Sequence, residues 1–137
     1  MSKMKTIEFN IPIHIDVGVR KKKKIFLNYN IARNLQFNVL NTIKKKTKAI
    51  VKEVCPEFRF ELYELEYKLF LPNKLKRDIS NVCCIVDKFV NDALVELDFV
   101  PEDNYEYLKK VTYMFGGFDI EGDGYVTVKV IEKIKEV

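Results

Sequence analysis

The sequence has no tryptophan, a single histidine and only three cysteines among its 137 residues. Cys55, Cys83 and Cys84 form no CxxC pair and no even set, so they predict neither a structural zinc site nor a disulfide scaffold, and we expect reduced thiols. No apolar run approaches the roughly 20 residues that a membrane span needs, and residues 1–5 lead into strand-like sequence without a signal peptide's apolar core. We therefore expect a cytoplasmic protein.

Several motifs of catalytic and ligand-binding sites are also missing. There is no G-x-x-x-x-G-K-[ST] loop, which argues against a nucleotide cofactor, and there is no HExxH motif or nucleophile elbow. Asp119 to Gly124 begins like a calcium-binding loop, but Val130 stands where the twelfth position requires glutamate, so a turn between strands is the better interpretation. His14, the only histidine, falls on the polar side of a predicted strand and receives no role. Any catalysis therefore depends on Asp, Glu and Lys.

Charge is distributed unevenly along the chain, although the net charge is only +4. Residues 1–52 hold 13 of the 24 Lys and Arg residues and two of the 20 acids, Glu8 and Asp16, which gives that segment a charge of +11. The remaining 11 basic and 18 acidic residues give the rest of the chain a charge of −7. A basic half favours a polyanionic partner and an acidic half can hold a metal ion. The same division also suits two solvated faces of one domain.

Hydrophobic periodicity predicts one α+β domain over residues 1–137. Alternating apolar residues predict strands over residues 5–17, 25–27, 58–71, 111–115 and 125–131, with a bulge near Leu62 or Tyr63 and a break at Gly116-Gly117. Helical spacing predicts one helix that begins at Asn30 as its N-cap and ends at Val54, before Cys55-Pro56, and a second over about 81–97 with Ser80 as its N-cap. These elements do not alternate as βαβ units, so we expect a mixed or antiparallel sheet with two main helices packed against it.

Acidic residues around the second predicted helix are candidates for a metal site. Asp78 precedes that helix, Asp87 lies about two turns from Ser80 on the same face, and Glu102 and Asp103 occupy the turn that follows. Carboxylate oxygens suit Mg²⁺, which often binds through few carboxylates plus a substrate phosphate, and bound metal ions promote phosphodiester hydrolysis. Acidic residues are also common at helix caps and in turns, where they bind no metal. Spacing alone leaves both interpretations open.

The order of these motifs resembles the RusA-type Holliday junction resolvases of phages and prophages. The family pattern has an Asp-x-Asp-Asn turn at a helix start, then Lys, then Asp-Ala-Leu, then a closing acidic pair. This chain shows Asp78-Ile79-Ser80-Asn81, then Lys88, then Asp92-Ala93-Leu94, then Glu102-Asp103. Asn28-Tyr29-Asn30 with Arg33, and Gly116-Gly117-Phe118-Asp119, also look like parts of the family. Two departures are that Ser80 stands where the family commonly has its second Asp, and that the helix is one turn longer before Lys88.

The resemblance implies a RusA-like fold and a homodimeric endodeoxyribonuclease, a hydrolase of DNA recombination and repair that uses Mg²⁺, or alternatively Mn²⁺. It would cut the paired strands of a four-way DNA junction. Asp78 and Asp103 resemble metal ligands, Lys88 resembles the catalytic lysine, and we hypothesise that Asp87 replaces the carboxylate missing at Ser80. The alternatives are a catalytically inactive junction-binding protein of the same fold and a small basic structural protein. The predicted DNA-binding residues are Asn28, Arg33, Lys21, Lys22, Lys23, Lys24, Lys44, Lys45, Lys74, Lys76 and Arg77.

Overall fold

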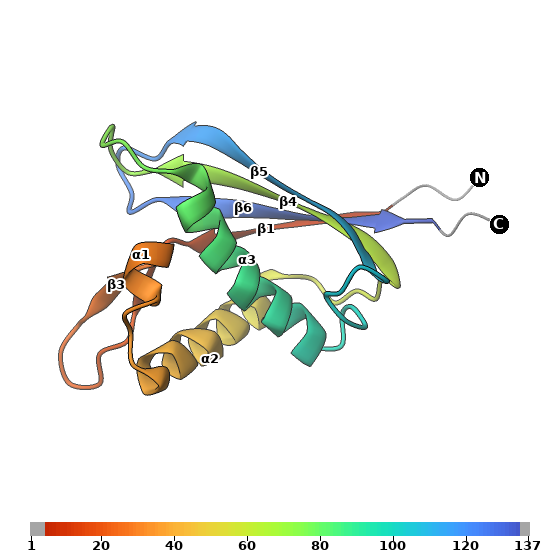
Figure 1. The fold of residues 1–137 in the computed structure, drawn as a ribbon, viewed down its shortest axis with the longest axis horizontal. Coiled ribbons are helices and arrows are strands. Elements are labelled where there is room, and N and C mark those ends of the chain that lie inside the picture. The colour runs from red at the N-terminus through yellow and green to blue at the C-terminus, as the bar shows by residue number, and fades with distance from the viewer. Residues whose placement is uncertain (1–4, 135–137) are drawn as a thin grey trace.

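Four long strands form one mixed sheet, and the helices cover one of its faces (Figure 1). The computed structural model describes residues 5–134. The strands lie in the order β1 (Thr6–Pro12), β6 (Tyr125–Lys133), β4 (Leu62–Leu71) and β5 (Leu108–Phe118). β6 pairs antiparallel with both β1 and β4, whereas β4 and β5 run parallel. The predicted α+β class, with a mixed sheet and two main helices, is confirmed.

Helix α3 (Ile79–Glu96) connects the two parallel strands, because it carries the chain back from the end of β4 to the start of β5. The β4–α3–β5 segment is therefore a βαβ unit. The sequence pattern did not predict this single unit, because the alternation of apolar residues reports which face of a strand is buried but not the direction in which the strand runs.

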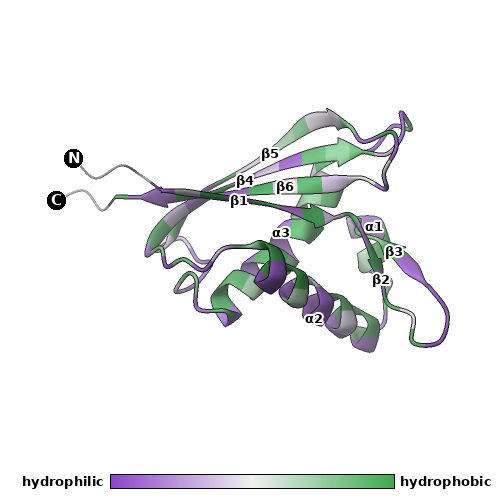
Figure 2. Ribbon diagram, turned by 180° about the vertical axis from the view of Figure 1, so that it is seen from behind, coloured by the Kyte–Doolittle hydropathy of each residue, from purple (hydrophilic) through white to green (hydrophobic). Residues whose placement is uncertain are grey.

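The core lies between the sheet and helices α2 (Phe37–Val54) and α3. Alternate residues of β4 and β6 point toward the helices and are buried, for example Leu65, Leu69 and Val128. Apolar and polar bands alternate along α2 (Figure 2), as expected for a helix that turns one side to the core and the other to solvent. Within residues 5–134, no helix is both long enough and apolar enough to cross a membrane.

The predicted helix from Asn30 to Val54 is divided into α1 (Tyr29–Ala32) and α2, and the prediction of one continuous helix is wrong. The side-chain amide of Asn34 donates to the carbonyl of Asn30, the group that would accept from the Asn34 backbone N–H in a continuous helix. The Asn34 backbone N–H donates to the carbonyl of Ile31 instead. Asn28, not Asn30, is the N-cap, since its Oδ1 accepts from the Asn30 N–H at 2.8 Å.

The predicted first strand is also divided, at Ile13. Its second part, β2 (His14–Asp16), leaves the main sheet and pairs with β3 (Lys24–Phe26) as a separate two-stranded sheet. Asp16 Oδ1 accepts from the backbone N–H groups of Gly18 and Lys23 at 3.0 Å each, which fixes the connecting loop. We call β2, β3 and the loop of residues 17–23 the basic hairpin.

Three further predicted boundaries differ from the structure. The long strand begins at Leu62 instead of residue 58, although a register shift between Tyr63 and Glu64 in the pairing with β5 lies where the bulge was predicted. Helix α3 begins at Ile79, so Asp78 occupies the N-cap position and Ser80 lies within the first turn. Gly116-Gly117 lies inside β5 and coincides with a second register shift instead of ending the strand.

Candidate functional site

Asp87 lies in the middle of α3 on the side that faces the sheet. Its Oδ1 accepts a hydrogen bond from the Tyr67 hydroxyl of β4 at 2.7 Å, and its Oδ2 accepts one from the Tyr113 hydroxyl of β5 at 3.0 Å. The side-chain amide of Asn91, one turn further along α3, also donates to Oδ1. These three donors come from three different elements, so the carboxylate is held in one orientation.

A second layer of hydrogen bonds connects this network to the acidic turn after α3. Asn91 is only 4% exposed, and its Oδ1 accepts from the Tyr63 hydroxyl at 3.2 Å. The Tyr63 hydroxyl also lies 3.1 Å from the backbone carbonyl of Glu102. The turn that carries Glu102 and Asp103 is thereby fixed next to the residues that hold Asp87.

Burial determines the protonation of these groups. It raises the pKa of Asp87 above the ordinary value of 3.8, the hydrogen bonds from Tyr67, Tyr113 and Asn91 offset part of that increase, and the negative charge of Asp103 adds to it. Burial, together with the nearby Asp87 carboxylate, also raises the pKa of both Tyr67 and Tyr113 well above the ordinary value. Both tyrosines therefore keep their protons at neutral pH and remain donors to the carboxylate.

Asp103 is close enough to influence two carboxylates of α3. Asp103 raises the pKa of Asp92 as well as that of Asp87. Burial is the largest cause of the raised pKa of Asp92, and the positive charges of Lys44 and Lys88 offset part of the increase. We call Asp87, Asp92 and Asp103 the acidic cluster. Residues distant in sequence therefore lie near enough for their charges to influence one another's pKa.

Asp78 does not join the acidic cluster. It is exposed at the start of α3, where its Oδ2 accepts from the Asn81 side-chain amide at 3.2 Å. Asp87 lies nine residues further along, a rise of about 13.5 Å in a regular helix. Ser80 lies seven residues before Asp87, a rise of about 10.5 Å in a regular helix. In the described part of the chain, no three or more His, Cys, Asp or Glu side chains are grouped closely enough to hold a metal ion.

Lys88 follows Asp87 on α3, but its side chain is exposed and lies between two adjoining hollows that share Leu40, Lys88 and Phe89. One hollow, of about 160 Å³, is also lined by Tyr29, Ala32, Arg33 and Ile85. The other, of about 260 Å³, is also lined by Phe37, Asn41, Lys44 and Asp92. We call these two hollows the helical groove. The structure thus brings Lys88 together with Arg33 and Lys44, two of the residues predicted to bind DNA.

The other predicted DNA-binding residues lie mainly around the basic hairpin. Lys21, Lys22 and Lys23 are exposed in its loop, and Lys24 forms an ion pair with Asp123 at 2.8 Å. The Arg77 guanidinium lies 4.9 Å from the ring centre of Phe26 in β3, which joins the loop before α3 to the hairpin. The remaining residues of this group are Lys74 and Lys76, exposed in that loop, Lys45, exposed on α2, and Asn28, whose side-chain oxygen caps α1.

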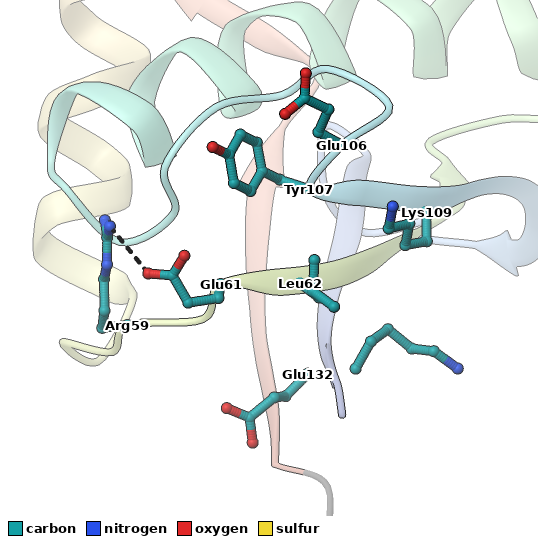
Figure 3. Close-up of a pocket in the computed structure, with 8 residues that line it drawn as sticks. Arg59, Glu61, Leu62, Glu106, Tyr107, Lys109 and Glu132 are labelled. Atoms are coloured by element: carbon teal, nitrogen blue, oxygen red, sulfur yellow. Dashed lines mark hydrogen bonds and ion pairs between the residues drawn. The ribbon is translucent and has the colours of Figure 1, made fainter. Parts of the chain in front are cut away.

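Another hollow, of about 630 Å³, lies near the end of the sheet away from the basic hairpin (Figure 3). Arg59, Lys109 and Lys133 line it together with Glu61, Glu106 and Glu132, and Leu62 and Tyr107 complete the lining. These residues come from separate segments, so no local motif identified them. Three positive and three negative side chains give this hollow no preference for a polyanion, and we do not place DNA there.

The sequence pattern also missed the residues that hold Asp87. Tyr63, Tyr67 and Tyr113 lie in segments that the sequence predicted as strands, but no role was given to their hydroxyl groups. The available signal was the choice of tyrosine instead of phenylalanine at three inward positions of adjacent strands, because a buried hydroxyl needs a partner. Asn91, a buried amide within the apolar stripe of α3, was a similar signal.

Comparisons with known proteins do not extend this picture. No family model matches the chain, and no curated protein matches it. The resemblance to RusA-type resolvases stays a prediction.

Proposed function

We propose that this protein is a metal-dependent, structure-selective endodeoxyribonuclease that resolves Holliday junctions by paired phosphodiester hydrolysis. The observation that carries the proposal is the Asp87 carboxylate, which is largely buried, held by three donors and influenced by the charge of Asp103. Lys88, the next residue of α3, is exposed at the helical groove. Burying a carboxylate costs stability unless it is fully hydrogen-bonded, and groups with a perturbed pKa cluster at functional sites. A helix that served only to cover the sheet would not need one there.

Asp87 and Asp103 fit Mg²⁺, or Mn²⁺, as a pair of carboxylates. Three hydrogen bonds use three of the roughly four acceptor positions of the Asp87 carboxylate, which leaves one position on Oδ2. Asp103 is exposed. Mg²⁺ commonly binds through one or two carboxylates and keeps waters and substrate phosphate as its other ligands. Such an ion, when bound, would polarise the scissile phosphate and lower the pKa of a bound water.

The remaining residues would position the DNA and balance its charge. The ammonium group of Lys88 would contact the phosphate at the cleavage point and stabilise the negative charge that develops there. Arg33 and Lys44 would hold neighbouring phosphates along the helical groove, although Lys44 must then share its charge with Glu96, 3.2 Å away. The basic hairpin, with Lys74, Lys76 and Arg77, would contact a second region of the DNA backbone.

Paired cleavage requires two active sites on one junction. We therefore propose that the protein acts as a homodimer, because a two-fold axis presents two identical sites to strands of opposite direction. DNA in the bacterial cytoplasm is the corresponding substrate, and the three free thiols suit a reducing compartment.

A second candidate is a junction-binding protein without nuclease activity. The observation that favours it is the distance of Asp78 from the acidic cluster, together with Ser80 in place of a carboxylate. With two carboxylates instead of three, the metal affinity of such a site would be lower.

The test is cleavage of a synthetic four-way junction in Mg²⁺ by the full chain. We expect paired cuts by the wild type and loss of cleavage in Asp87→Asn, Asp103→Asn and Lys88→Ala, with unchanged cleavage in Glu57→Gln, which alters an exposed acid before β4. Asp78→Asn decides whether Asp78 contributes to the site.

Three other outcomes would change the proposal. Tight, salt-sensitive junction binding without metal-dependent cleavage would select the inactive binding protein. Absence of salt-sensitive binding would contradict both candidates and leave a small basic structural protein. Full cleavage by Asp87→Asn would remove the central residue of the proposed site.

A further inference from the structure

Strand β5 has one edge without a partner. It pairs with β4 on one side, and no strand in residues 5–134 pairs with its other side. The opposite edge of the sheet, β1, is shorter and is protected by Pro12 at its end and by the exposed charge of Glu8. β5 is 11 residues long, has no proline, and carries charges only at its start, on Lys109 and Lys110.

The β5 edge also exposes apolar side chains. Val111 is 39% exposed, and Phe115 and Phe118 are each 45% exposed, with ring centres 5.3 Å apart. Ile120, just after the strand, is exposed as well. A long apolar edge strand is a template for another strand, and soluble monomers normally protect such edges. This edge therefore has the properties of an interface.

Self-complementarity identifies a second copy of this chain as the partner. In an antiparallel pairing of two β5 strands centred on Met114, Tyr113 of one copy lies opposite Phe115 of the other. Because the bulge adds one residue at Gly116, Val111 then lies opposite Phe118, and Lys110 lies opposite Asp119, just after the strand. Opposite charges then meet at both ends and aromatic rings meet near the centre. A parallel pairing would instead bring Lys109 and Lys110 of both copies together. We propose that β5 pairs antiparallel with β5 of a second copy, which joins the two sheets into one.

This pairing has a consequence for the proposed function. Antiparallel pairing of identical edges places the two-fold axis perpendicular to the joined sheet, so the helices of both copies lie on the same face. Tyr113, which donates to Asp87, belongs to β5 itself. Each acidic cluster would therefore lie beside the interface and face the same side as its counterpart. The importance of placing both acidic clusters on one face rests on the proposed function. The β5–β5 pairing itself does not depend on that function.

The experiment measures the oligomeric state of the full chain by sedimentation equilibrium without DNA or metal. We expect a wild-type dimer and a dissociation constant at least about tenfold higher in Phe115→Lys and in Val111→Lys. Phe37→Lys is the matched control, because Phe37 is 82% exposed on α2, away from β5. Circular dichroism checks that each variant is folded.

Cysteine cross-linking tests the register independently of those substitutions. Met114→Cys should form an intermolecular disulfide on mild oxidation, whereas Thr112→Cys, displaced from the axis, and the wild type should not. A wild-type monomer at every concentration, a dimer insensitive to both lysine variants, or cross-linking at Thr112 but not at Met114 would each overturn the proposed pairing. A monomer that cuts junctions would contradict only this interface, and a dimer that cuts nothing would contradict only the nuclease.

Discussion

At the scale of single residues, the defining feature is a carboxylate within the helix–sheet interface. Asp87 is tolerated there because Tyr67, Tyr113 and Asn91 supply donors where water is largely excluded. A hydrogen bond to a charged acceptor contributes about 1.5–3 kcal/mol, compared with about 1 kcal/mol for a neutral pair. The tyrosines therefore matter more to stability than their aromatic surface alone would suggest.

Removing one of these donors should destabilise the protein. Tyr67→Phe keeps the ring but leaves Asp87 with one donor fewer, so we expect the free energy of unfolding at pH 7 to fall by about 1.5–3 kcal/mol. Tyr125→Phe is the control: its half-buried ring stacks on Phe70 at 4.7 Å on the open face of the sheet, and we expect a change below about 0.5 kcal/mol. Urea unfolding measures both. Equal losses in the two variants would contradict a special role for the hydroxyl at Tyr67.

The raised pKa of Asp87 predicts a pH dependence of stability with a definite sign. Because burial raises the pKa above 3.8 in the folded state, the folded protein binds this proton more tightly than the unfolded chain does. The contribution of Asp87 to stability is therefore most favourable below pH 3.8 and declines as pH rises through the folded-state pKa.

This pH dependence can be isolated by comparing the wild type with Asp87→Asn, which has no proton to exchange at this position. We expect the unfolding free energy of the wild type, relative to the variant, to decrease as pH is raised from 3.8. Carboxyl-carbon NMR of the wild type should give a midpoint for Asp87 above that value. A midpoint at or below it would show that the hydrogen bonds outweigh burial.

At the scale of secondary-structure elements, the sequence predicted buried faces better than connections. The helical spacing that predicted the second helix comes from apolar residues such as Val82, Ile85, Val86 and Phe89, and these residues are buried on α3. The division between α1 and α2 was not predicted, because the apolar spacing continues through Leu35 while the break arises from the side chain of Asn34. A local hydrogen bond of this kind leaves no periodic signal.

Two glycines allow a direct test of backbone strain. Gly124, before β6, has φ 85°, and a Cβ there would lie 2.7 Å from Ile13 Cδ1 and 2.9 Å from the Phe70 carbonyl oxygen. Gly117, in β5, has φ 142°, but the nearest atom to a Cβ would be 3.8 Å away, on the ring of Phe70. The positive φ at both positions is unfavourable for a residue with a side chain. Only at Gly124 would an added Cβ also clash with neighbouring atoms.

We therefore expect Gly124→Ala to lower the unfolding free energy by about 2–4 kcal/mol and Gly117→Ala by about 1 kcal/mol. Thermal unfolding under identical conditions measures the difference. If Gly117→Ala proved the more destabilising, the strain in β5 would have to come from the bulge and not from the dihedral angle alone.

At the scale of the whole molecule, the acidic cluster and the basic hairpin are held at separate places by one fold. The separation was only partly visible in the sequence. Counting charges located a basic amino-terminal segment, but pairing with Asp123 and Glu96 engages Lys24 and Lys44, respectively. Only the folded chain distinguishes these paired lysines from exposed Lys21 and Lys22. Similarly, the family resemblance implied that Asp78, Asp87 and Asp103 belong to one site, whereas nine helical residues place Asp78 about 13.5 Å from Asp87 along the axis of α3.

These placements predict which lysines contribute to DNA binding. A lysine that contacts a phosphate of duplex DNA releases a counterion and adds about 0.9 to the steepness of the plot of log affinity against log salt concentration. We compare two double variants that remove the same charge. Lys21→Gln with Lys22→Gln alters the exposed loop of the basic hairpin, and Lys68→Gln with Lys129→Gln alters the open face of the sheet.

The hairpin variant should reduce the salt dependence of junction binding by up to about 1.8 in slope, because both side chains can lie against the phosphate backbone. The open-face variant should leave the slope nearly unchanged, since the glutamates on that face, Glu66 opposite Lys129 among them, repel phosphate. Fluorescence anisotropy of a labelled four-way junction, titrated at several salt concentrations in Ca²⁺ instead of Mg²⁺, measures both slopes. Equal reductions in the two variants would mean that binding responds to net charge alone, and the hairpin would then lose its assignment as a DNA contact.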